Sequence, residues 1–441
     1  MAQRWRALVV TIRGALAGGI LREFVGFGSS TVLMQASRVV SDLVVAAMLG
    51  PETWGAWYLL NLIIVYGALG QLGALNGMNR EVPAALGRDR PDEASDLRRV
   101  TLGVMLATTA AVSASLLVAS LFLPSPAAPR ELLVVLVLLA AHQGHNYAVT
   151  SLKATTRFMA VARLQLVMVV AYPLFGVGGA LLGGLAGFIA GQVLAYALVS
   201  AFASRSREVI LRPRFDLVRA RALIKIGFPI MLVGVVHVFY TTVDRWIVVA
   251  FLGTESLGHY SLAIMTLSAV GLLPRVIGQQ FYPRMAFAWS ANRDPDELRA
   301  IAARVRTMAF AVVIPAVLAV MIAVPPLVRA LLPAFEPGIA PLLVTMIVPL
   351  VSVVGQGFGG VLHMLDRQNW LLGAITVALI VNGIVGALLV GPLGLVGVAV
   401  GTLVAHALYA ALRVWLGHKA LRSLTSPQGP LRKASIDRVE S

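Results

Sequence analysis

The chain has 441 residues, of which 58% are hydrophobic and 13% are charged. Soluble domains are on average about 45–50% apolar and about 25% charged, so this composition excludes an ordinary soluble globular protein. The length suits an all-α polytopic membrane protein, because twelve spans of about 22 residues would fill roughly 60% of the chain. Cysteine is absent, which excludes disulfides, thiol nucleophiles and iron–sulfur clusters.

The first 24 residues are predicted to lie at the membrane surface. A cleavable signal peptide is not expected, because Arg13 and Arg22 interrupt the apolar run. Hydrophobic residues at helical spacing, such as Trp5 and Leu8, instead predict an interfacial helix over 1–24. The arginines of this helix are expected to contact the anionic headgroups of membrane lipid.

Twelve apolar segments follow and are predicted to span the membrane. They cover residues 25–49, 54–77, 100–123, 131–151, 162–180, 184–203, 227–252, 257–281, 307–332, 338–363, 370–390 and 393–416. The 36 lysines and arginines lie in the N-terminal segment, in every second connection, and in the end of the last span with its tail. The exceptions are Arg38, Arg130, Arg245, Arg275 and Arg329.

This distribution of charge predicts an orientation. By the positive-inside rule, both termini are cytoplasmic in a multi-pass protein of the cytoplasmic (inner) membrane. The net charge of +16 is therefore attributed to orientation, and no nucleic-acid partner is expected.

The sequence contains an internal repeat. Residues 44–58 align with 247–261 at an offset of 203, which matches Gly50 with Gly253. Both halves continue into a cytoplasmic loop that carries an Arg-Asp pair and a Pro-Asp-Glu string. In the second loop, residues 294–297 are interpreted as the start of a helix, with Asp294 as its cap.

A second match pairs two glycine-rich runs at an offset of 210. The runs begin at Gly184 and Gly394, and their glycines are predicted to let helices approach closely. Six spans return the chain to its starting side, so both halves have the same orientation. We therefore predict parallel six-helix bundles at 25–210 and 211–416, followed by a basic cytoplasmic tail at 417–441.

Charged and polar side chains form stripes on several predicted spans. The stripes comprise Thr31, Gln35, Arg38 and Asp42 on the first span, His237, Thr241, Asp244 and Arg245 on the seventh, and Ser268, Arg275, Gln279 and Tyr282 on the eighth. Charges inside a membrane generally face a wet cavity or a partner. Two structural alternatives stay open: Arg38 and Asp42 could neutralise each other within one helix, and Arg275 could extend to the cytoplasmic interface.

The sequence lacks the residue patterns of metal sites and of nucleotide-binding loops. The histidines of the fourth span have no carboxylate or thiolate co-ligands, so no metal site is expected. No phosphate-binding loop of the G-x-x-x-x-G-K-[ST] type occurs. Neither catalytic residues nor a cofactor are expected, and the connections on the outer side are short.

Two strings resemble a known family. LGPETWGAWYLLNLI at 49–63 and NREVPAAL at 79–86 are similar to the start of the polysaccharide biosynthesis transport family, the Wzx-type flippases of lipid-linked oligosaccharides. This family lies within the multidrug/oligosaccharidyl-lipid/polysaccharide exporter superfamily. The resemblance implies two bundles around a central cavity that is lined by the first, second, seventh and eighth spans.

The resemblance also implies a substrate, a polyprenyl-pyrophosphate-linked oligosaccharide carried from the inner to the outer leaflet by alternating access. Arginine suits pyrophosphate, so Arg38, Arg245 and Arg275, with Gln35 and Gln279, are the expected binding residues. Coupling or gating is expected of Asp42, Asp244 and His237, including an Asp42–Arg245 bridge between the bundles. A glycan polymerase and glycosyltransferases of the same pathway are the expected protein partners.

Two alternatives remain at this stage. A cation-coupled drug or metabolite antiporter of the same fold would show acidic and aromatic cavity walls. A membrane glycan polymerase or ligase would be an enzyme and would carry a long extracytoplasmic loop, which the predicted topology lacks.

Overall fold

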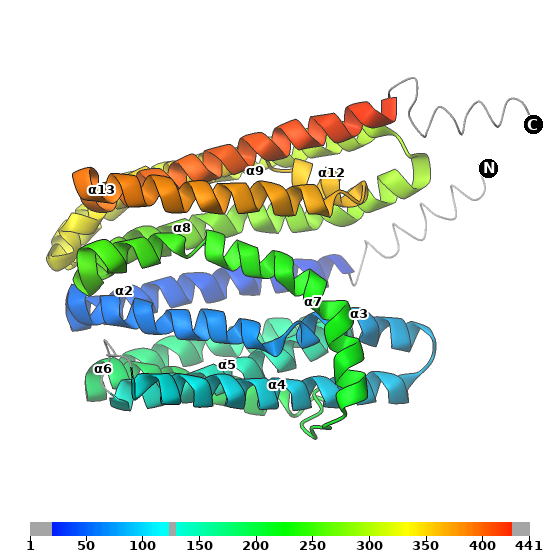
Figure 1. The fold of residues 1–441 in the computed structure, drawn as a ribbon, viewed down its shortest axis with the longest axis horizontal. Coiled ribbons are helices and arrows are strands. Elements are labelled where there is room, and N and C mark those ends of the chain that lie inside the picture. Colours follow the sequence, from blue (N-terminus) through cyan, green and yellow to red (C-terminus); the bar gives the residue numbers. More distant parts are fainter. Residues whose placement is uncertain (1–19, 123–128, 426–441) are drawn as a thin grey trace, which may run out of the picture. The chain divides into compact units, whose positions relative to one another are not determined.

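The structure is a computed structural model in which residues 20–122 and 129–425 are described. Throughout this part of the chain the regular secondary structure is helical, without strands (Figure 1). The all-α class predicted from the sequence is therefore confirmed. Most of the predicted interfacial segment 1–24 and of the basic tail 417–441 lies outside the described residues.

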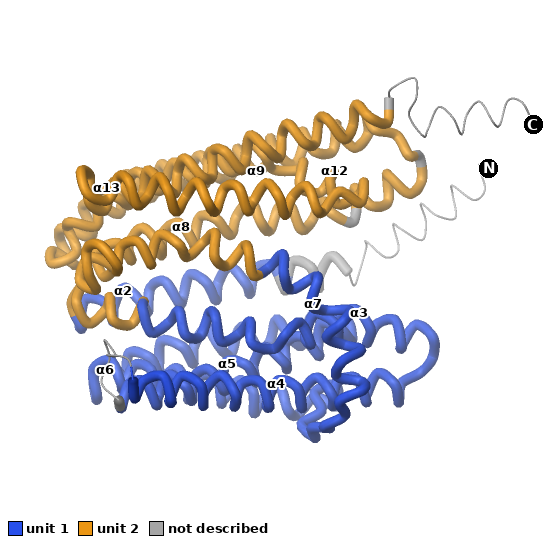
Figure 2. The backbone as a smooth tube through the Cα atoms, in the orientation of Figure 1, with its two compact units in different colours: residues 1–49, 59–234 blue, residues 50–58, 235–441 orange. Residues whose placement is uncertain are grey.

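The chain forms two compact units (Figure 2). Unit 1 comprises residues 1–49 and 59–234, and unit 2 comprises residues 50–58 and 235–441. The helices of the first part of the chain are α2 (Ile20–Gly67), η1 (Ala68–Gln71), α3 (Ala74–Gly87), α4 (Pro91–Ser120), α5 (Pro129–Ala154), α6 (Phe158–Ala203) and α7 (Leu217–Tyr240). Those of the second part are α8 (Val243–Asn292), α9 (Pro295–Leu331), η2 (Pro333–Gly338), α10 (Ile339–Thr345), α11 (Ile347–Val354), α12 (Phe358–Met364) and α13 (Gln368–Thr425).

Eight stretches of the described residues are long and apolar enough to cross a membrane. They are Gly28–Gln71, Pro91–Ser120, Arg130–Ala154, Phe158–Ala203, Leu217–Ala291, Pro295–Leu331, Pro333–Val354 and Gln368–Leu424. The protein is therefore a multi-pass membrane protein. Several stretches exceed the roughly 20 residues that one span needs, because α2, α6, α8 and α13 each continue through a glycine with non-helical backbone angles. The count of twelve spans stays a prediction.

The internal repeat is present in the backbone conformation. Gly50 (φ 77°, ψ 168°) and Gly253 (φ 84°, ψ −179°) adopt the same turn within α2 and α8. Gly184 (φ 58°, ψ −138°) and Gly394 (φ 55°, ψ −135°) do the same within α6 and α13. These are the two pairs that the sequence matches at offsets of 203 and 210. Glycine enters this region of φ without a steric penalty, which explains its presence at all four turns.

The glycine-rich runs bring two helical arms into close contact, as predicted. A Cβ atom at Gly187 would collide with the carbonyl oxygen of Gly179, on the other arm of α6. In α13, a Cβ atom at Gly397 would collide with the carbonyl oxygen of Leu389. Backbone approach of this kind is how helices associate where lipid removes the hydrophobic driving force.

The two units divide within α7. The first half of this helix packs on α3, where a Cβ atom at Gly227 would collide with the backbone of Gly73 and one at Gly77 with the carbonyl oxygen of Leu223. These contacts place residues up to Gly234 in unit 1. The predicted division near residue 210 stays a prediction.

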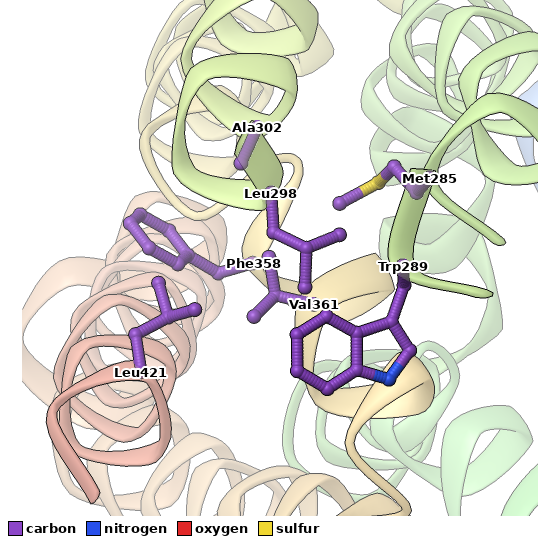
Figure 3. Packing of buried hydrophobic residues seen from close by; sticks show 7 residues of the cluster. All are labelled: Met285, Trp289, Leu298, Ala302, Phe358, Val361 and Leu421. Carbon is purple, nitrogen blue, oxygen red and sulfur yellow. The ribbon is translucent and has the colours of Figure 1, made fainter. Parts of the chain in front are cut away.

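One end of unit 2 has an apolar core (Figure 3). Its buried members come from α8, α9, α12 and α13 and are Met285, Trp289, Leu298, Ala302, Phe358, Val361 and Leu421. The neighbouring start of α9 has the predicted cap, because the carboxylate of Asp294 accepts a hydrogen bond from the backbone N–H of Asp296 at 2.8 Å. Pro295 occupies the first turn, where its missing N–H costs nothing.

Candidate functional site

Arg38 lies half-buried on the first arm of α2, within unit 1. Its Nη2 donates a hydrogen bond to the hydroxyl oxygen of Tyr196 at 3.3 Å. Its guanidinium carbon lies 4.8 Å from the ring centroid of Tyr172, in a cation–π contact. Insertion of an arginine at the centre of a bilayer costs about 2.5–3.5 kcal/mol, and these aromatic contacts offset part of that cost.

Asp42 lies one turn further along α2 and is held by the same tyrosine. The hydroxyl of Tyr172 donates a hydrogen bond to Oδ1 of Asp42 at 2.9 Å. Within the described part of the chain, no ion pair shorter than 4.0 Å joins Arg38 to Asp42. Tyr172 therefore contacts both charged side chains. Mutual neutralisation of Arg38 and Asp42 within the helix stays an open alternative.

Histidines complete the surroundings of Arg38. The rings of His142 and His145, from α5, each lie 5.3 Å from the ring of Tyr196. Asn146 Nδ2 and His142 Nδ1 are 3.3 Å apart. We call the group formed by Arg38, Asp42, Tyr172 and Tyr196 with these two histidines the unit 1 centre.

In unit 2, the predicted pair Asp244 and Arg245 lies at the start of α8. Asp244 is buried and accepts hydrogen bonds from the hydroxyl of Tyr260 at 3.2 Å and from the backbone N–H of Arg245 at 2.9 Å. The guanidinium carbon of Arg245 lies 6.0 Å from the ring centroid of Tyr58. Its Nε is buried and has no hydrogen-bond partner among the described residues.

The remaining predicted residues lie in more open places. Arg275 and Gln279 are exposed on the second arm of α8, and Gln35 is half-buried on α2. His237 is exposed on α7, with its ring 6.3 Å from that of Tyr240. Arg38 and Asp42 thus lie close together in unit 1, and Asp244 and Arg245 lie close together in unit 2.

Sequence reasoning missed Arg413, which it assigned to the cytoplasmic end of the last span. This side chain lies on α13, where its Nη2 donates a hydrogen bond to the carbonyl oxygen of Ser352 at 2.9 Å. Its guanidinium carbon lies 4.8 Å from the ring centroid of Tyr409. Tyr240 contacts both Tyr409 and His406, with ring centroids 5.7 and 4.7 Å apart. We call these residues the unit 2 centre.

The unit 2 centre is built on helices equivalent to those of the unit 1 centre. At the offset of 210, Ser352 matches His142 and His406 matches Tyr196. The signal that could have found Arg413 is its spacing of four residues from Tyr409 and seven from His406, which places all three on one helix face. Tyr172 and Tyr196 of the unit 1 centre were also missed, and no spacing in the sequence connects them with Arg38 or Asp42.

In both centres an arginine contacts the ring of a tyrosine. Among the described residues, neither Arg38 nor Arg413 forms an ion pair with a carboxylate. A guanidinium held by aromatic rings keeps its charge and has donors left over for a bidentate contact with phosphate. The predicted Asp42–Arg245 bridge and the central cavity stay predictions.

Comparisons with known proteins place this arrangement in a family. A family model described as polysaccharide biosynthesis protein matches residues 85–334, more than half of the chain. No curated protein sequence matches the chain.

Solved structures of MATE transporters share the fold. An inward-facing multidrug resistance MATE family transporter of the MOP superfamily is 16% identical, with 90% of this chain and 96% of that chain covered at a TM-score of 0.71. A variant of the Vibrio cholerae MATE transporter VcmN is 14% identical, with 94% and 98% covered at a TM-score of 0.65. The chain therefore has the fold of a MOP-superfamily transporter and belongs to the polysaccharide biosynthesis protein family.

Proposed function

We propose that the protein is a flippase that moves a polyprenyl-pyrophosphate-linked oligosaccharide from the inner to the outer leaflet of the cytoplasmic membrane by alternating access. The unit 1 centre is the observation that carries this proposal. Arg38 is a cation inside an apolar helix whose partners are tyrosines rather than a carboxylate. Such a group suits an anionic substrate better than a cationic drug.

The membrane potential supplies a driving force for this direction of transport. A pyrophosphate carries about two negative charges, and outward movement of each one is favoured by an inside-negative potential by about 2.3 kcal/mol per 100 mV. The total is roughly 4–5 kcal/mol per 100 mV. ATP hydrolysis by this chain is then unnecessary. Asp42 and Asp244 are proposed to couple or gate this movement, with His237.

A cation-coupled antiporter of drugs or metabolites is the second candidate. The observation that favours it is the pair of carboxylates at Asp42 and Asp244, each of which accepts a hydrogen bond from a tyrosine within its own unit. A carboxylate held in this way could exchange a cation for a proton. Transport of a soluble cation would support this candidate, whereas the flippase requires movement of a lipid-linked glycan.

Headgroup flipping by the purified full chain in liposomes tests the flippase directly. A lipid-linked oligosaccharide with a fluorescent sugar is placed in both leaflets, and the share protected from an external quencher is followed over time. We expect scrambling with the protein and none in empty liposomes. Transport of an organic cation without glycan flipping would instead establish the antiporter.

Variants identify the residues that bind the pyrophosphate. Replacing Arg38, Arg245 or Arg275 by Lys keeps the charge but loses the planar guanidinium, so flipping should fall in part. Replacement by Ala should cost more, because positive charge is lost. The matched control is Arg212→Ala, an exposed arginine of the connection between α6 and α7. Full flipping by all three Ala variants would refute the assignment.

A further inference from the structure

Unit 1 contains a cavity at the end where three of its connections meet. Its volume is about 570 Å³, and it is lined by Leu86, Arg98, Thr155, Thr156, Arg157, Met159, Ala160, Arg163 and Glu208. These residues come from the end of α3, the first part of α4, the turn between α5 and α6, the start of α6, and the segment after α6. The predicted topology places all of these connections on the cytoplasmic side.

The cavity is lined by three arginines and one glutamate, and two of the arginines contact that glutamate. Arg98 is buried and is held by the carbonyl oxygens of Ala94 at 3.1 Å and Glu208 at 2.7 Å. Arg157 is exposed, and its Nε and Nη2 donate hydrogen bonds to Oε1 of Glu208 at 3.3 and 3.2 Å. Arg163 is exposed and has no hydrogen-bond or ion-pair partner among the described residues. Three arginines and a single glutamate give the lining an excess of positive charge, and Arg163 is the arginine without a carboxylate partner among the described residues.

The equivalent end of unit 2 shows that the fold does not require such a cavity. The turn is conserved in conformation, since Thr156 (φ 60°) and Asp366 (φ 55°) correspond at the offset of 210. Counted from the prolines that begin α4 and α9, the residue equivalent to Arg98 is Ala302. Figure 3 shows Ala302 within the apolar core of unit 2.

The two ends also differ in the length of one helix. α13 continues to Thr425 and brings Leu421 into the apolar core, whereas α6 ends at Ala203. The chain then bends and brings Glu208 to Arg98, at 3.6 Å between the charged groups. Unit 1 thus has an arginine-lined cavity where unit 2 has packed side chains.

We propose that this cavity, the Arg157–Arg163 pocket, binds the headgroup of an anionic phospholipid of the inner leaflet. Arginine recognises phosphate oxygens through paired N–H donors, and Arg157 and Arg163 are both exposed at the opening. Leu86, Met159 and Ala160 supply apolar surface for the part of the lipid next to the phosphate. The volume lies within the roughly 300–1,000 Å³ typical of ligand sites. This site is separate from the unit 1 centre and does not depend on which substrate is transported.

Lipid binding to the purified full chain tests the proposal. The apparent affinity for phosphatidylglycerol is measured in detergent by native mass spectrometry, with phosphatidylcholine for comparison. We expect wild type to prefer phosphatidylglycerol, and the double variant Arg157→Gln with Arg163→Gln to bind it about tenfold more weakly, as expected for a lost charge-assisted contact. The matched control is Arg367→Gln, which alters the equivalent arginine in unit 2. It should bind phosphatidylglycerol as wild type does.

Three results would overturn the proposal. The first is equal phosphatidylglycerol binding by the double variant and wild type, at the same melting temperature. The second is an equal loss in Arg367→Gln, because binding would then reflect general surface charge. The third is displacement of phosphatidylglycerol by inorganic phosphate at an equal concentration, which would show that the apolar lining contributes nothing and that the ligand is a free anion.

Discussion

Placing an arginine within an apolar helix costs free energy, and contacts with tyrosine rings offset part of that cost for Arg38 and Arg413. Arg38 stacks on Tyr172, and Arg413 stacks on Tyr409. Contacts with aromatic rings lower the cost of burying the guanidinium without removing its charge. Two consequences can be measured at the scale of single residues.

The first concerns the hydroxyl of Tyr172. Tyr172→Phe keeps the ring beneath Arg38 and removes the hydroxyl that donates to Asp42, so we expect a loss of about 1.5–3 kcal/mol of stability, the usual worth of a hydrogen bond to a charged group. Thermal unfolding in detergent measures it. In an Asp42→Asn background the same change should cost clearly less. An equal cost in both backgrounds would show that this contact contributes no energy.

The second concerns Arg413. If the unit 2 centre also contacts the pyrophosphate, Arg413→Met should lower the rate of headgroup flipping about tenfold, the effect of one lost charge-assisted contact. Lys should restore part of the rate. The matched control is Arg304→Met, an exposed arginine on α9. A rate equal to wild type for Arg413→Met, at equal amounts of folded protein, would limit the binding role to unit 1.

At the scale of elements, the glycine turns are the features that sequence predicted best. Gly50, Gly184, Gly253 and Gly394 were paired from sequence spacing alone, and their backbone angles agree pair by pair. Local signals of this kind survive because a positive φ needs glycine wherever the helix is placed. The cap at Asp294 was predictable for the same reason.

The partners of Arg38 could not be predicted in this way. Tyr172 lies 130 residues from Asp42, and Tyr196 lies 158 residues from Arg38. A tyrosine on an apolar helix has the same local pattern whether it packs in the core or holds a charge. Only the packing of α2 against α6 distinguishes the two cases. The contacts of Arg413 were missed because this residue was counted with the other charges at the end of the last span.

The close contact within α6 gives a prediction at this scale. Gly187→Ala places a Cβ atom against the carbonyl oxygen of Gly179 and should destabilise the protein by about 1–3 kcal/mol, the usual cost of overpacking. Gly178→Ala is the matched control, because a Cβ atom there meets nothing within 4 Å. It should be neutral or gain about 0.5–1 kcal/mol from helix propensity. Equal melting temperatures for the two variants would show that the arms of α6 can separate without cost.

At the scale of the whole molecule, the two units share a backbone plan and differ in what fills it. The same turns recur at Thr156 and Asp366, yet one unit has an arginine-lined cavity there and the other an apolar core. The two halves therefore share these turns, whereas the side chains at equivalent places differ. The lipid site is accordingly proposed at a place where the two units differ.

The orientation of the chain in the membrane is the last prediction. The chain has no cysteine, so a single introduced cysteine reports one position without background. Glu255→Cys lies in an exposed place beside the Gly253 turn, and Arg212→Cys lies in the exposed connection between α6 and α7. The positive-inside rule places the first outside and the second in the cytoplasm. A membrane-impermeant maleimide applied to intact cells should therefore label only Glu255→Cys, and both variants should react once the membrane is opened.

The reverse pattern would change more than the topology. Arg157 and Arg163 would then face the outer leaflet, where the anionic phospholipid proposed for their pocket would have to be sought. The pull of an inside-negative potential on a pyrophosphate would stay outward, but the basic connections would no longer lie on the side where lipid-linked precursors are assembled. If only Glu255→Cys is labelled, the basic connections lie on the cytoplasmic side. This result agrees with both the proposed direction of transport and the proposed inner-leaflet lipid site, because both depend on the side of the membrane that the arginines occupy.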